Sequence, residues 1–125
     1  RSSTARGVLP SAVPHVDAAF TAGRAALLVH ALAADPSLLL DATEDRLHQA
    51  YRSSVMPSTW GLVERLRERG EAATVSGAGP TVLVMGRRQD RDRLDAALDE
   101  ILDGASGWAV LRPEIDRHGA TVDRL

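Results

Sequence analysis

The chain contains no cysteine, few aromatic residues and no excess of charge of one sign. Without cysteine it can form neither a disulfide framework nor a thiolate metal site. Basic residues number 15 and acidic residues 17, so the net charge of −2 provides no field for binding nucleic acid. No uninterrupted apolar run reaches the roughly 18 residues of a membrane span, and the start shows no signal-peptide pattern. These absences predict a cytoplasmic protein that binds neither nucleic acid nor a membrane.

The 125 residues suffice for one domain or part of one. Hydrophobic residues make up 44% of the chain but aromatic residues only 3%, so leucine, valine and alanine must fill the core. Hydrophobic periodicity and turn signals predict helices, strands and an irregular lead-in. The predicted helices are 15–34, 36–48, 57–69 and 89–103; the predicted strands are 71–76, 81–86 and 108–111, with 120–125 as an edge strand; the lead-in is 1–14. This order indicates an α+β fold, with helices packed on one face of a small antiparallel sheet.

A glycine-rich turn, S-G-A-G-P-T at 76–81, joins the two central predicted strands. Gly77 and Gly79 remove two Cβ atoms there, so backbone N–H groups can approach an anion or a small polar ligand. Pro80 fixes its own φ and keeps the loop from closing into a helix. Taken alone, the turn is more typical of an ordinary tight connection between strands than of a ligand site.

Three further blocks accompany this turn: A-R-G-V-L-P at 5–10, R-A-A-L-L-V at 24–29 and D-R-L-H-Q-A-Y-R at 45–52. In this order and spacing, from about Ser2 to about Val110, the chain resembles the C-terminal half of the homoserine kinases. These enzymes are a branch of the GHMP small-molecule kinases, whose third signature motif resembles S-G-A-G-P-T. Another GHMP kinase is the nearest rival, but the first and third blocks favour the homoserine branch.

The resemblance implies that residues 1–125 form the ferredoxin-like C-terminal, substrate-side domain of such a kinase, without its first strand. The family's N-terminal ATP-binding domain carries a P-x-x-x-G-L-G-S-S-A loop, which this sequence lacks. ATP and Mg²⁺ would bind mainly to that absent half, and the chain alone is expected to be inactive. The complete enzyme would phosphorylate L-homoserine to O-phospho-L-homoserine in threonine biosynthesis. A chain that begins at Arg1 rather than at Met fits this expectation of an incomplete protein.

The resemblance also assigns two arginines to the substrate carboxylate. Arg6, in the A-R-x-x-L-P block, and Arg52, which closes the third block, would grip it with paired charged hydrogen bonds. Without the resemblance, Arg6 is a solvated surface residue and Arg52 a charge at a helix C-terminus. Ala50 stands where the family usually has proline.

The remaining site residues come from the same comparison of motifs. Gly77 would touch the substrate through its backbone, and Ser2 would lie near the substrate hydroxyl. The neighbouring loop residues that would shape the turn are Ser76, Ala78, Gly79 and Pro80. Arg24 would either line the site or form a structural ion pair; Thr21 replaces the asparagine that the family has before it.

No catalytic residue is assigned, because phosphoryl transfer in this family is expected to rest on positioning and charge stabilisation. His48 is interpreted as a hydrogen-bonded structural residue or a support of the site rather than as a general base. None of the four histidines has the spacing of a metal-ligand pair, so no metal site is predicted in this chain.

Two other classes of function compete with the kinase interpretation. A small non-catalytic ferredoxin-like module could bind an amino acid through the glycine-rich turn and regulate an attached enzyme. A structural or dimerising domain could instead use Trp60 and Trp108 on an exposed patch, although a core position suits both better. The kinase interpretation itself predicts three partners: homoserine, the N-terminal kinase domain and a second copy in a homodimer.

Overall fold

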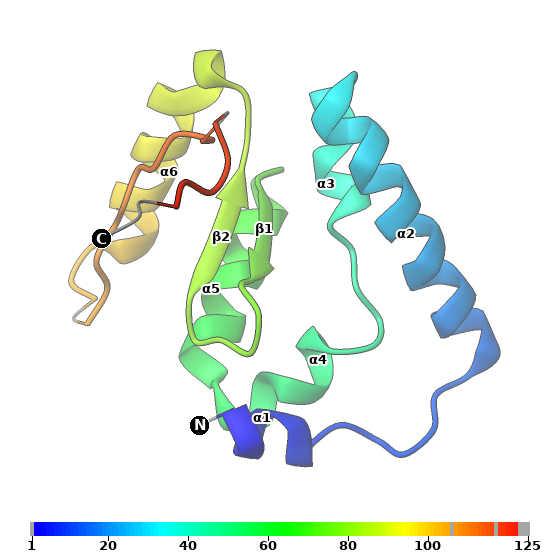
Figure 1. Cartoon of the computed structure of the whole chain (residues 1–125). Coiled ribbons are helices and arrows are strands. Elements are labelled where there is room, and N and C mark those ends of the chain that lie inside the picture. Colours follow the sequence, from blue (N-terminus) through cyan, green and yellow to red (C-terminus); the bar gives the residue numbers. More distant parts are fainter. Residues whose placement is uncertain (1, 106, 117, 123–125) are drawn as a thin grey trace.

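The structure, a computed structural model, describes residues 2–105, 107–116 and 118–122, and of Ser2 only the backbone. It is an α+β fold in which a two-stranded sheet lies between helical segments (Figure 1). The helices are α1 Ser2–Gly7, α2 His15–Ala33, α3 Leu39–Ala42, α4 Gln49–Arg52, α5 Pro57–Glu68 and α6 Arg91–Leu102; three short 3₁₀ turns are Pro36–Leu38, Ser53–Val55 and Arg88–Asp90; the strands are β1 Ala72–Val75 and β2 Val82–Met85.

The two strands pair antiparallel, with Ala72 opposite Met85 and Val75 opposite Val82. Helices α5 and α6 pack together against this hairpin and form the main core with it (Figure 1). The buried members of this core are Leu62, Val63, Leu66, Ala73, Val75 and Ile101. Trp60 and Trp108 are partly buried and pack against the same cluster, which agrees with the expectation that neither forms an exposed patch.

A second, smaller core joins α2 and α3 to the start of β1 through Ala31, Leu39, Ala42 and Ala72. The opposite face of α2 is exposed and apolar. By length and composition α2 is long and apolar enough to cross a membrane, with a mean hydropathy of 1.3 over 18 residues. The helix meets this criterion although no uninterrupted apolar run of the sequence is that long, and one such helix is by itself weak evidence for a membrane span. Core helices of soluble proteins have the same length and composition but are mostly buried, whereas only 6% of this stretch of α2 is buried. Asp17 and Arg24 of α2 are paired within the domain.

The predicted helix 36–48 is wrong as a single element. The chain instead forms a 3₁₀ turn and α3, and then runs without helix until α4 begins at Gln49. The Thr43 hydroxyl donates to the carbonyls of Leu39 and Leu40, at 2.9 and 3.1 Å, where α3 ends. The Asp45 carboxylate then accepts backbone N–H groups further along the chain. Short polar side chains thus bond to the backbone in place of a continuing helix.

The two ends of the chain also differ from the prediction. Residues 2–7 form α1 within the segment expected to be irregular, and α2 starts directly after Pro14. The predicted strand 108–111 is not formed: Gly104 and Gly107 turn the chain at positive φ, and Arg112 ties it to Asp95 of α6 at 2.9 Å. Residues 120–122 form no strand either, while 123–125 of that prediction lie outside the described residues.

Candidate functional site

Arg52 joins three segments that lie far apart in the sequence. Its Nε donates to the carbonyl of Ala5 in α1 at 3.2 Å, and its Nη1 donates to the carbonyl of Gly77 in the glycine-rich turn at 2.9 Å. The arginine itself ends α4. The structure thus brings together the segments of Arg6, Arg52 and Gly77, which the motifs had singled out independently.

The start of α4 is fixed by Asp45. Its carboxylate accepts the backbone N–H groups of Leu47, His48 and Gln49 at 3.1, 2.9 and 2.6 Å. Burial alone would raise the pKa of Asp45. The hydrogen bonds from these N–H groups and from the His48 ring have the larger opposite effect, so the pKa lies below its ordinary value. A four-residue helix is too short to persist on propensity alone, so this cap helps to determine where Arg52 lies.

His48 is half-exposed, and its Nδ1 lies 3.1 Å from Oδ1 of Asp45. This contact supports the interpretation of His48 as a hydrogen-bonded structural residue. Gln49, by contrast, is buried, and its side-chain oxygen accepts the backbone N–H of Val75 at 2.7 Å. Sequence reasoning missed both Asp45 and Gln49, although an aspartate shortly before a short helix is a recognisable capping signal.

The turn 76–81 is closed by its own backbone. The N–H of Ser76 donates to the carbonyl of Thr81 at 2.8 Å, and the N–H of Gly79 donates to the carbonyl of Ser76 at 3.0 Å. Gly77 and Gly79 adopt φ of +59° and +78°, a region in which a side chain is strained. The Thr59 hydroxyl of α5 donates to the carbonyl of Pro80 at 3.1 Å and holds the far side of the turn.

A cleft of about 310 Å³ lies beside this turn. It is bordered by α1, the segment before α5 and the turn itself; its lining residues are Thr4, Ala5, Val55, Met56, Pro57, Ser58, Thr59, Ala78, Gly79 and Pro80. Arg52 and Gly77 do not line this cleft; Arg52 is connected to it through the carbonyl of Ala5, which does. In the described part of the chain, the N–H groups of Gly77 and Ala78 make no hydrogen bond. A cationic side chain and open backbone donors suit a small anionic group.

Arg6 lies on α1 directly after Ala5, and its side chain is exposed. Within residues 2–105, 107–116 and 118–122, the Arg6 side chain makes no hydrogen bond or ion pair, while the Arg6 carbonyl accepts the backbone N–H of Leu9 at 3.2 Å. Ser2 opens the same helix, but its side chain lies outside what the structure describes. The site roles of these two residues therefore stay predictions.

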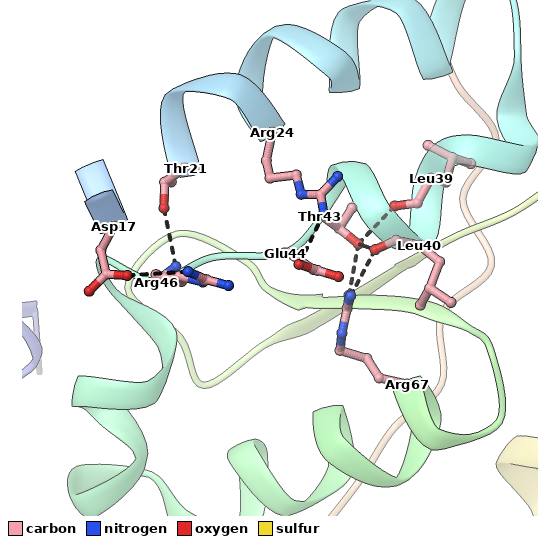
Figure 2. A network of polar contacts seen from close by, with 9 residues as sticks. All are labelled: Asp17, Thr21, Arg24, Leu39, Leu40, Thr43, Glu44, Arg46 and Arg67. Carbon is pink, nitrogen blue, oxygen red and sulfur yellow. Dashed lines mark hydrogen bonds and ion pairs between the residues drawn. The ribbon is translucent and has the colours of Figure 1, made fainter. Parts of the chain in front are cut away.

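Arg24 lies in a second polar cluster, between α2 and α5 (Figure 2). Its Nη2 donates to Glu44 at 3.4 Å, and its guanidinium stacks on Phe20. Arg46 stacks on the same ring, pairs with Asp17 at 3.4 Å and donates its backbone N–H to Thr21. These contacts give Arg24 the structural ion pair that was one of its two interpretations.

The same cluster contains Arg67 of α5, whose guanidinium binds three oxygens from other elements. Figure 2 shows two of these acceptors, on Thr43 and Leu40. It donates to the Thr43 hydroxyl at 2.8 Å, to the Leu40 carbonyl at 2.7 Å and to the Ala73 carbonyl at 3.1 Å. Burial lowers the pKa of Arg67 from its ordinary value. Arg67 thus ties α5 to α3 and β1.

The model of the family described as GHMP kinases, C terminal, matches residues 21–104, which include α2 from residue 21 onward, α3 to α6 and the glycine-rich turn. The chain belongs to the GHMP kinase family. The domain placed around Arg52 is thus a GHMP kinase C-terminal domain, and the α+β architecture is the one expected for it.

Curated relatives of this GHMP kinase chain include homoserine kinases from two actinobacteria. The chain is 54% identical to that of Streptomyces avermitilis over 121 residues, and 48% identical to that of Leifsonia xyli subsp. xyli over 124 residues. These alignments cover 97% and 99% of the chain but 38% of each relative. The chain therefore spans less than two fifths of the length of the relatives that it matches.

A solved structure has the same fold. The crystal structure of a homoserine kinase from Cytophaga hutchinsonii superposes with a TM-score of 0.69 at 21% sequence identity. The match covers 85% of this chain and 35% of that one. It supports the fold of the C-terminal domain.

Proposed function

We propose that residues 1–125 form the substrate-side domain of a kinase that transfers the γ-phosphate of ATP to the hydroxyl of L-homoserine. The product would be O-phospho-L-homoserine, on the route to threonine. One observation carries the proposal: Arg52 contacts both the segment of Arg6 and the glycine-rich turn. The names of the relatives with 48–54% identity support the choice of homoserine.

In this proposal Arg52 has donors left for a carboxylate. Its Nε and one N–H of Nη1 are used by the two backbone carbonyls, so the other Nη1 hydrogen and both Nη2 hydrogens remain. Two such N–H groups on neighbouring nitrogens would match the two oxygens of a carboxylate. Arg6, exposed on the neighbouring helix, would supply the second cation.

The glycine-rich turn would contribute through its backbone. The open N–H groups of Gly77 and Ala78 can donate to polar atoms of the substrate without the desolvation cost of a charged side chain. Because the carbonyl of Gly77 is bound to Arg52, substrate held by the arginine lies next to these donors. The domain thus fixes the substrate, which is the main protein contribution in phosphoryl transfer.

ATP and Mg²⁺ would be held by the part of the enzyme that corresponds to the remaining length of the relatives. In the described residues no group of three histidine, aspartate or glutamate side chains is placed to hold a metal ion, so we assign no magnesium ligand here. The N-terminal kinase domain is the principal partner in this proposal. A cytoplasmic location and a homodimer are further parts of it.

The direct experiment uses the full-length protein of the native reading frame. ADP release would be measured with ATP and either L-homoserine, mevalonate or galactose, and homoserine binding would be measured in parallel by calorimetry. We expect release that depends on homoserine and not on the other two alcohols. Homoserine binding without ADP release would contradict the kinase proposal and support an amino-acid-binding module. Release with mevalonate or galactose instead would place the protein in another branch of the family.

A further inference from the structure

Gln49 is the only glutamine in the third motif block and is among the few buried polar side chains of the domain, with 8% of its surface exposed. It lies at the first position of α4, three residues before Arg52. Its side-chain oxygen accepts the backbone N–H of Val75 at 2.7 Å, across 26 residues of sequence. A buried hydrogen bond of this kind is costly to break, because the N–H left behind finds no water.

The bond is made on the edge of β1 that faces away from β2. The Ser76 N–H to Thr81 carbonyl bond marks the hydrogen-bonded pairs of the hairpin, so Thr74 pairs with Leu83 and Val75 directs its N–H outward. The carbonyl of Ala73, on the same edge, accepts from Arg67. Two side chains thus occupy the positions at which a neighbouring strand would otherwise bond.

Two contacts consequently run from α4 to one short stretch of chain. Gln49 binds Val75, the last residue of β1, and Arg52 binds Gly77, two residues later in the turn. The spacing of three residues on α4 places both side chains on one face of the helix. The Gln49 bond therefore sets the register between α4 and the turn, and with it the place at which the Arg52 guanidinium meets Gly77.

We propose that Gln49 is a positioning residue that determines substrate affinity by holding Arg52 against the glycine-rich turn, an inference that rests on the proposed function. Gln49 is buried behind the strand and acts through Arg52 rather than on the substrate. A neutral amide oxygen suits this place, since it accepts the Val75 N–H without adding a buried charge beside the guanidinium.

The test uses Gln49→Met in the full-length protein, because methionine keeps the length of the side chain and removes the acceptor. Thr43→Val is the matched control: Thr43 is also buried, and its hydroxyl accepts from Arg67, which is not one of the contacts of Arg52. We expect the KM for homoserine to rise about tenfold or more in Gln49→Met, with kcat and the KM for ATP within about twofold. Thr43→Val should lower thermal stability to a similar degree without this change in KM.

An unchanged KM in Gln49→Met, or an equal rise in both variants, would overturn the proposal. A second measurement keeps it distinct from the proposed function. The Arg52 Nε–H should give a protected signal in nuclear magnetic resonance spectra of the wild type and of Thr43→Val, and lose that protection in Gln49→Met. If the wild type fails to phosphorylate homoserine, the proposed function is wrong, but the signal still tests the positioning role of Gln49. Retained protection of the Arg52 Nε–H in Gln49→Met would overturn that role.

Discussion

Arg52 donates to the carbonyl of Gly77 at 2.9 Å, although 25 residues separate the two in the sequence. The contact connects the end of a four-residue helix to the apex of a hairpin turn. Because the same guanidinium also reaches Ala5, its position depends on three segments at once. This convergence turns three separate motif blocks into one site, and it makes the predictions below specific to individual contacts.

The two glycines of the turn should differ in their tolerance of a side chain. Gly79→Ala should destabilise the protein by more than Gly77→Ala. Both substitutions place a side chain at positive φ, at a cost of about 1–2 kcal/mol. A Cβ at residue 79 would also lie 2.8 Å from Sδ of Met56 and 3.2 Å from Cγ1 of Val75, whereas one at residue 77 has open space.

The free energy of unfolding of both variants should be measured by urea denaturation. Gly86→Ala is the control, because a Cβ there meets nothing within 4 Å and no positive φ is involved. Equal losses in Gly77→Ala and Gly79→Ala would show that the contact with Met56 does not constrain the turn.

Removing the Arg67 guanidinium should cost far more than removing an exposed one. Arg67→Met leaves the Thr43 hydroxyl and two carbonyls without their donor, which predicts a loss of about 2–3 kcal/mol in unfolding free energy. Arg69→Met provides the comparison, since Arg69 pairs with the exposed Glu100 on the surface. Such surface pairs contribute about 0–1 kcal/mol. Similar losses in the two variants, measured by urea denaturation, would contradict the structural role of Arg67.

Asp45 should make the stability of the domain sensitive to acid. Its pKa lies below the ordinary value of 3.8, so the folded state favours the charged carboxylate. The resulting stabilisation is complete above that value and disappears as the pH falls through the lower pKa of the folded state. Asp45→Ala should therefore cost about 1–2 kcal/mol at neutral pH, in line with the loss of a helix cap.

The measurement is the difference in unfolding free energy between the wild type and Asp45→Ala, followed from pH 7 to about pH 3. We expect a constant difference down to about pH 4.5 and a decline below about pH 4. A difference that is unchanged over the whole range would show that the carboxylate charge does not hold the start of α4.

Local sequence signals predicted much of this fold. The apolar periodicity of α2, α5 and α6 places a core face on each helix, and the glycine pair at 77 and 79 marks the hairpin turn. The prediction of a single helix over 36–48 was wrong because the side chains of Thr43 and Asp45 bond to the backbone there. The pattern of apolar residues contains no information about such bonds. Capping and interruption of this kind depend on single polar atoms.

The site was predictable in part, for a different reason. Arg52 and Gly77 stand in recognisable motifs, so each could be selected before their contact was known. The bond between Gln49 and Val75 left no local signal, because it joins residues 26 apart and depends on which edge of β1 faces α4. Contacts that fix geometry across the fold therefore escaped sequence reasoning, whereas the residues expected to meet the ligand were selected from motifs and their roles stay predictions.

The most direct test of the account compares homoserine with 3-aminopropan-1-ol, which has the same amine and hydroxyl but lacks the carboxylate. In the full-length wild type, kcat/KM should favour homoserine strongly. Arg52→Met and Arg6→Ala should each reduce kcat/KM for homoserine about ten- to hundredfold more than kcat/KM for 3-aminopropan-1-ol. Arg88→Ala, an exposed surface variant paired with Glu114, should behave as the wild type. Equal losses on both substrates would contradict a carboxylate clamp built by Arg6 and Arg52.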